Sequence, residues 1–119
     1  MDYFLTEEQQ AIVETAREVA VKKIKPEREH CDAEEKFSWE AVEALRKADL
    51  FGVYIHPNYG GMGGGGFELC LVVEEISKVC GGIALSIACG GLCSFPIILF
   101  GTPEQKKKYL PDIASGKKL

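Results

Sequence analysis

The chain has 119 residues, of which 46% are hydrophobic, and its formal net charge is −4. This length suits one domain with one core, and the hydrophobic content is too high for a disordered chain. No basic stripe with interleaved aromatic residues is present, which argues against a nucleic acid partner. Met1-Asp2-Tyr3-Phe4 carries an acid where a signal or transit peptide would carry bases, so we expect a cytoplasmic protein.

The first half of the chain predicts three helices. Thr6-Glu7-Glu8-Gln9 fits a capping box and should begin the first helix, which Pro26 should end, before a short second helix through residues 27–36. Ser38 should cap the third helix, which ends near Leu50. Apolar residues at helical spacing predict the buried faces of the first and third helices: Ile12, Ala16, Val19, Ala20 and Ile24, then Trp39, Val42, Leu45 and Ala48.

A loop is expected from Phe51 to Gly66, although residues 51–55 also suit a short strand. The fourth helix should span about Phe67 to Val79. Its apolar residues should face the core, and its charged residues, Glu68, Glu74, Glu75 and Lys78, should face solvent. The last helix should begin at Thr102, which is followed by a first-turn proline, and should be closed by Pro111.

Between these two helices, no charged side chain occurs from Val79 to Pro103. The run is long enough to cross a bilayer, but several glycines and Pro96 interrupt it and no aromatic belt flanks it. We therefore interpret it as a helix buried on nearly all sides inside protein, with no membrane involved. Because two interior glycines and a proline disfavour a regular helix, we expect a break or kink between Gly90 and Pro96.

Several candidate sites have a simpler structural interpretation. The run from Gly61 to Gly66 has the G-x-G-x-x-G spacing, but the acid of a dinucleotide site and the Gly-Lys-Ser/Thr of a phosphate loop are both missing, so we interpret it as a flexible connector. Five cysteines without a secretory signal indicate free, mostly buried thiols. Cys89 and Cys93 lie four residues apart on one helix face, but too few further ligands accompany them for a typical metal site. His56 lacks an evident catalytic partner.

The uncharged run leaves one candidate. Small and medium side chains lie at helical spacing in it, and such a helix leaves space beside it. Either a neighbouring helix fills this space, or the space remains as an apolar slot for a ligand. The spacing of the residues alone favours close packing by a helix. The residues concerned are Ala84, Leu85, Ala88, Cys89 and Leu92.

Four motifs in register resemble the N-terminal domain of acyl-CoA dehydrogenases. They match this family in order and spacing over nearly the whole chain: Phe4-Leu5-Thr6-Glu7-Glu8-Gln9, Pro57-Asn58-Tyr59-Gly60-Gly61-Met62-Gly63, Glu74-Glu75-Ile76-Ser77, and Phe100-Gly101-Thr102-Pro103-Glu104-Gln105-Lys106-Lys107-Lys108-Tyr109-Leu110-Pro111. The resemblance implies an all-α bundle of about five to six helices, with a Gly-rich loop and a buried uncharged helix, over residues 1–119.

The resemblance also implies a function for the parent enzyme. The family removes two hydrogens from the α and β carbons of an acyl-CoA thioester with FAD, passes electrons to an electron-transfer flavoprotein, and usually forms homotetramers. In the family a middle β-domain and a C-terminal helical domain hold most of the flavin and the catalytic base, so we expect no catalytic or cofactor-binding residue in this chain and no activity from it alone.

By position, the resemblance assigns Ala84, Leu85, Ala88, Cys89 and Leu92 to the wall of the acyl pocket. This shifts our preference from helix packing toward a ligand wall, and the lack of charge favours an apolar acyl group. A stand-alone helical interaction module, with the uncharged segment covered by self-association, is the alternative.

Overall fold

The computed structural model describes residues 4–119, and in this range the chain is helical and contains no strand. Residues 1–3, on which the expected absence of a leader peptide partly rests, lie outside the described residues. The α-helices are α1 (Glu7–Val19), α2 (Lys25–Ala33), α3 (Trp39–Lys47), α4 (Gly66–Ser77), α5 (Gly81–Phe100) and α6 (Pro103–Ala114). The all-α prediction of five to six helices is confirmed.

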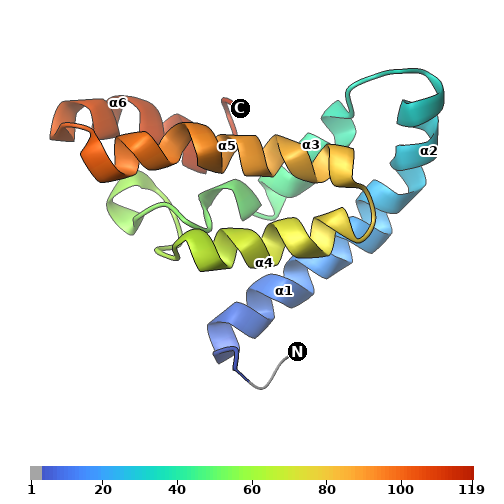
Figure 1. The fold of residues 1–119 in the computed structure, drawn as a ribbon, viewed down its shortest axis with the longest axis horizontal. Helices are drawn as coiled ribbons and strands as arrows, with labels where there is room; N and C mark the ends of the chain where they lie inside the picture. Colours follow the sequence, from blue (N-terminus) through green and yellow to red (C-terminus); the bar gives the residue numbers. More distant parts are fainter. Residues whose placement is uncertain (1–3) are drawn as a thin grey trace.

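The helices form two layers, as Figure 1 shows. Helices α4 and α5 make an antiparallel hairpin, and α6 folds back along the second half of α5. Helix α1 crosses α4 on the side away from α5, and α3 lies behind α5. Buried side chains from α1, α3, α4, α5 and α6 meet in one cluster that includes Ala16, Leu45, Val72, Ile87 and Leu110.

The helix starts follow the sequence closely. Thr6 and Thr102 each form a complete capping box, with Gln9 and Gln105 as the reciprocal partners. The hydroxyl of Ser38 accepts a hydrogen bond from the Ala41 amide, as expected for the cap of α3. The caps of α1 and α4 are also joined, because Gln9 donates its side-chain amide to Glu68 at 2.7 Å while Glu68 accepts from the Gly65 amide at 2.7 Å.

The prolines were predicted to end or break helices, and in the structure they do not. The chain passes from α1 into α2 through a π-helical segment, Ala20–Ile24 (η1), so Pro26 falls in the first turn of α2, where its missing N–H costs little. Pro96 lies inside a continuous α5, and Pro111 lies inside α6, which runs on to Ala114. The expected break in the uncharged run is therefore absent, and the helix that Pro111 was predicted to close ends later.

The loop between α3 and α4 holds short 3-10 turns where a strand was possible. These are Leu50–Gly52 (η2) and Pro57–Tyr59 (η3). Residues 53–55 are buried in the core without strand pairing. The following glycines fold back over this stretch, and Gly61 packs so closely that an added Cβ would lie 1.9 Å from the Ile55 carbonyl oxygen. The glycine run is thus a packed turn.

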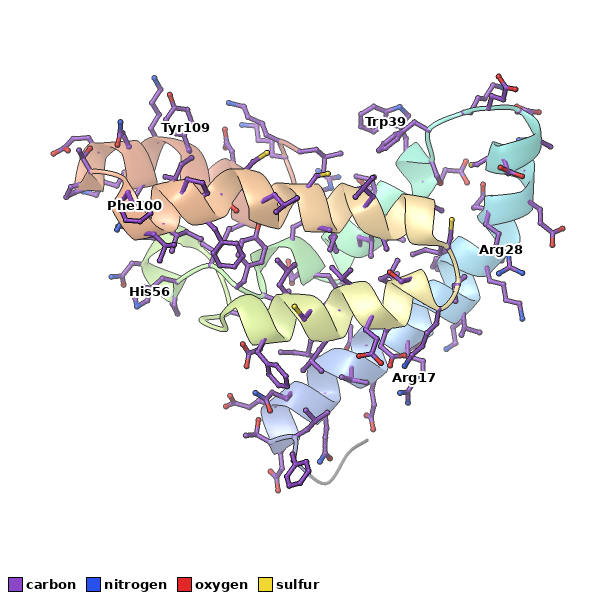
Figure 2. All side chains as sticks on the ribbon, in the orientation of Figure 1. Arg17, Arg28, Trp39, His56, Phe100 and Tyr109 are labelled. Carbon is purple, nitrogen blue, oxygen red and sulfur yellow. The ribbon has the colours of Figure 1, made fainter. Side chains whose placement is uncertain are left out.

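Three exposure predictions were wrong. Helix α5 is buried along one face only, and just 22% of its most apolar window is inside the protein. Trp39 is 69% exposed and packs edge-on against Phe37 beyond the core, at the margin of the molecule in Figure 2. Glu75 is buried, because it pairs with Arg17 across the contact between α1 and α4.

The thiols are also more exposed than expected. Cys70, Cys89 and Cys93 are exposed, and Cys31 and Cys80 are half-buried. All five are free, as predicted. For Cys89 and Cys93 the prediction of buried thiols was wrong because α5 is buried along one face only, and Cys70 is exposed on α4.

Candidate functional site

Helix α5 divides cleanly into two faces. Ala84, Ile87, Gly91 and Ser94 are buried against the rest of the domain. On the opposite side, exposed uncharged residues recur at helical spacing and form what we call the outward face: Leu85, Cys89, Leu92, Cys93, Pro96 and Leu99. Leu85 is 57% exposed, Leu92 72% and Leu99 66%, and Phe100 at the end of the helix is 86% exposed. This concentration of exposed large apolar side chains marks a surface suited to binding.

The predicted wall residues divide between the two faces. Leu85, Cys89 and Leu92 lie on the outward face, Ala88 lies half-buried at its edge, and Ala84 is 1% exposed in the core. Ala84 therefore supports the packing beneath the helix, whereas the other four are available to a ligand. Their assignment to an acyl pocket stays a prediction at this point.

Close packing against α4 fixes the position of α5. At Gly91 an added Cβ would lie 2.3 Å from Leu69 Cδ2, so glycine permits the two helices to approach. The helix propensity lost at Gly91 is therefore compensated by this packing. Phe95, on the same helix, stacks at a tilt on Tyr54 with ring centroids 5.3 Å apart.

A buried hydroxyl pair joins Ser94, two residues before Pro96, to Tyr54. Ser94 Oγ is 2.5 Å from the Gly90 carbonyl oxygen and 2.9 Å from Tyr54 Oη. Since the carbonyl only accepts, Ser94 donates to Gly90 and accepts from the Tyr54 phenol. Burial raises the pKa of Tyr54, so the phenol stays protonated and remains a donor. This pair ties the proline-containing half of α5 to the loop that follows α3.

The glycine loop offers no phosphate cradle. The amides of Met62, Gly63 and Gly64 donate to the carbonyls of Gly52, Ile55 and Val53, at 2.8–2.9 Å. The Gly65 amide is taken by Glu68. A phosphate loop needs free amides, and these are already satisfied within the protein. The interpretation as a connector is supported, although the loop is held in place by these bonds.

His56 and the acidic residues serve the fold. His56 Nδ1 accepts from the Asn58 amide at 3.1 Å and so caps η3, while Figure 2 shows the ring at the edge of the molecule. Burial of the Glu75 carboxyl opposes its ionisation, but hydrogen bonds and charge from Arg17 and Lys78 outweigh burial and hold the pKa of Glu75 below its ordinary range. In residues 4–119, no three His, Cys, Asp or Glu side chains gather to hold a metal ion.

Three surface hollows lie away from the outward face. One of about 600 Å³ lies between α1, η2 and the glycine loop, one of about 870 Å³ lies beside α3 and the C-terminal residues, and one of about 420 Å³ lies between α2 and the start of α5. Leu85, Cys89 and Leu92 line none of these three. The outward face is thus one exposed wall, and a closed apolar slot would need a second wall from other polypeptide.

By length and composition, α5 could also cross a membrane, since it has 20 residues and no charge. One such helix does not establish a membrane protein, because core helices of globular proteins meet the same criteria. Its buried face packs against α4 and α6, and its outward face lies free.

The geometry defines an all-α domain with an apolar helix face left open on one side. Comparison with known proteins identifies the family: the profile for the N-terminal domain of acyl-CoA dehydrogenases matches residues 6–117. The chain belongs to this family.

Individual relatives agree with this assignment. The short-chain-specific acyl-CoA dehydrogenase of Clostridium acetobutylicum is 40% identical over 100% of this chain, which corresponds to 32% of that protein. The solved butyryl-CoA dehydrogenase of Megasphaera elsdenii superposes with a TM-score of 0.89 at 33% identity, over 100% of this chain and 32% of that chain. A chain in a structure of the electron transferring flavoprotein of Acidaminococcus fermentans superposes with a TM-score of 0.92 at 38% identity, over 100% of this chain and 32% of that chain. This chain therefore spans about a third of the length of these relatives.

Proposed function

We propose that this domain supplies one apolar wall of the acyl pocket in an FAD-dependent acyl-CoA dehydrogenase. The observation that carries the proposal is the outward face of α5, where Leu85, Cys89 and Leu92 are exposed and no charge occurs from Val79 to Pro103. An acyl chain is apolar and uncharged, so such a surface suits it. The lack of charge also favours an apolar acyl group over a dicarboxylic one.

The proposed reaction removes hydrogens from the α and β carbons of the thioester, with FAD as the electron acceptor. FAD would supply the redox chemistry from the remainder of the enzyme. Among residues 4–119 the paired carboxylates Glu68 and Glu75 serve a helix cap and a helix contact, and α5 carries no carboxylate, imidazole, ammonium or guanidinium group. This chain's part is therefore to exclude water from the acyl chain and to position it, and we expect the chain alone to be inactive.

Further properties of the parent enzyme form part of the proposal. We expect a homotetramer that acts in fatty acid metabolism in the cytoplasm, without a nucleic acid or membrane partner. Electrons would pass to an electron-transfer flavoprotein, and the similarity to a chain in the Acidaminococcus structure of such a flavoprotein supports this partner.

A chimera tests the proposal directly. Residues 1–119 would replace the matched third of the Clostridium short-chain enzyme, and flavin content and bleaching of the flavin by butyryl-CoA would be measured. We expect the chimera to retain FAD and to react. Leu85→Arg should raise the KM for the acyl-CoA at least about tenfold, because a charge must then be buried beside the acyl chain.

Val21→Arg is the matched control, since Val21 is 52% exposed and lies in η1 rather than on α5. It should leave the KM unchanged. A flavin-loaded chimera in which Leu85→Arg and Val21→Arg have the same KM would contradict the assignment of the wall. Strong dehydrogenase activity from the 119-residue chain alone would contradict its proposed incompleteness.

A stand-alone interaction module is the second candidate, favoured by the same exposed face. In that case the outward faces of two copies would cover one another. Light scattering separates the two proposals: a discrete oligomer that Leu92→Glu dissociates would favour the module, and a monomer that requires the longer enzyme for function would favour the domain.

A further inference from the structure

Two half-buried thiols from distant parts of the chain line one hollow. Cys31 lies in the last turn of α2, and Cys80 is the residue immediately before α5. Both belong to the lining of the hollow of about 420 Å³ between α2 and the start of α5. None of the predicted wall residues lines this hollow, so it is separate from the outward face of α5.

A hydrogen bond holds α2 against the chain just before Cys80. Arg28 Nη1 donates to the Val79 carbonyl oxygen at 2.8 Å, and Figure 2 shows Arg28 near the turn that joins α4 to α5. Val79 directly precedes Cys80, and Arg28 lies three residues before Cys31 on α2. Residues three apart share a helix face, with Cβ atoms about 5–6 Å apart. The bond therefore turns the face of α2 that carries Cys31 toward Cys80.

The two thiols can be brought together at little cost in packing. A disulfide requires Cα atoms about 4.4–6.8 Å apart, so α2 must move into the hollow toward the start of α5. Of the residues 25–33 that form α2, none is buried, so this movement leaves the core intact. The Cys80 side chain makes no capping hydrogen bond to α5, so its sulfur can turn toward α2 without breaking one.

We propose that Cys31 and Cys80 form a reversible disulfide, with a small-molecule disulfide such as oxidised glutathione as the oxidant. The thiolate of one cysteine attacks the glutathione disulfide and releases one glutathione, and the second cysteine attacks the mixed disulfide and releases the other. The cysteine pair loses two electrons, and the two glutathione thiols formed carry these electrons and the two protons. In a reducing compartment such a bond is transient, so the site responds to the redox state.

This modification site goes beyond the proposed acyl wall, because it requires neither flavin nor thioester. The other three cysteines, Cys70, Cys89 and Cys93, do not line the hollow. The bond would pin α2 to the start of α5 and close a chain loop from residue 31 to residue 80. Closure of a loop of this length restricts the unfolded chain and should therefore stabilise the fold.

The test uses the 119-residue chain and a variant that keeps only the proposed pair, with Cys70→Ser, Cys89→Ser and Cys93→Ser combined. Each is incubated with oxidised glutathione, the monomer is isolated by size exclusion, and its unreduced tryptic peptides are weighed by mass spectrometry. Trypsin separates the two cysteines, because it cuts after Arg28, Lys36 and Lys78. We expect a linked pair of peptides in both proteins, and in the variant a rise in Tm of at least about 5 °C that dithiothreitol reverses.

Cys31→Ser in the same variant is the matched control. It should give one glutathione adduct on Cys80, no linked peptides and no rise in Tm, and circular dichroism should show that all reduced proteins are folded. Separate glutathione adducts on Cys31 and Cys80 without a linked pair would overturn the proposal. So would a link found only between two chains, or an equal rise in Tm in the Cys31→Ser control. None of these results bears on the acyl wall, which the chimera tests separately.

Discussion

Glu75→Gln gives the sharpest test of the contact between α1 and α4. The Glu75 side chain is 6% exposed, and its carboxylate accepts from Arg17 Nε at 3.0 Å, Arg17 Nη2 at 3.2 Å and Lys78 Nζ at 2.5 Å. Figure 2 shows Arg17 where α1 passes beneath α4. Glutamine keeps the shape but removes the charge and turns one acceptor into a donor that faces two cations.

The expected loss is moderate, because Arg17 is 55% exposed and recovers hydration in the variant. Hydrogen bonds to charged groups contribute about 1.5–3 kcal/mol, so we expect a loss of about 2 kcal/mol at pH 7. For a chain of this size the loss lowers Tm by about 8 °C. Urea unfolding followed by circular dichroism measures the free energy, and a thermal scan measures the Tm.

The pH dependence gives an independent check. The pKa of Glu75 is lowered from its ordinary value of 4.5 in the folded protein, so its contribution is present above pH 4.5 and is lost as pH falls through the folded-state pKa. The difference between wild type and Glu75→Gln should therefore shrink in that acidic range. Glu74→Gln is the matched control: Glu74 is 65% exposed in its pair with Lys78, and its replacement should cost no more than about 0.5 kcal/mol. Equal losses in the two variants, or a pH-independent difference, would refute this reasoning.

Two further predictions concern the loop and α5. Gly61→Ala should lower the free energy of unfolding by more than about 2 kcal/mol, because its Cβ would meet the Ile55 carbonyl, whereas Gly82→Ala, with open space around it, should be neutral or stabilising by up to about 1 kcal/mol. Urea unfolding of both variants checks this, and equal effects would contradict the packing argument. Ser94→Ala should cost about 1–3 kcal/mol by leaving the Tyr54 phenol without its acceptor. A double-mutant cycle with Tyr54→Phe should show coupling, and additive losses would contradict the hydrogen bond.

Local chemistry made much of the fold predictable. The caps at Thr6, Ser38 and Thr102 depend on residues within one helical turn, and the structure confirms all three. The buried stripes of α1 and α4 follow from spacing in the same way. The elements that matched are those whose determinants lie close together in the sequence.

The proline and glutamate errors share a different origin. Pro26 was expected to end a helix, but the π-helical segment before it shifts the register so that the proline occupies a first turn. Glu75 looks solvent-facing in sequence because its neutralising partner, Arg17, is on another helix. In both cases the outcome depends on a helix register or a contact between helices that residue type and local spacing do not predict.

The error over α5 arises from the thickness of the domain. The chain extends only 19 Å along its shortest axis, and a helix with its side chains is about 10–12 Å across, so only two layers of helices fit. In a two-layer domain every helix has one layer beneath it and a free side above it. An uncharged helix there must expose apolar residues, however hydrophobic it is, and burial of both faces would require a third layer. The sequence of α5 therefore indicates a surface made to be covered, and the outward face is where a covering polypeptide or a ligand would bind.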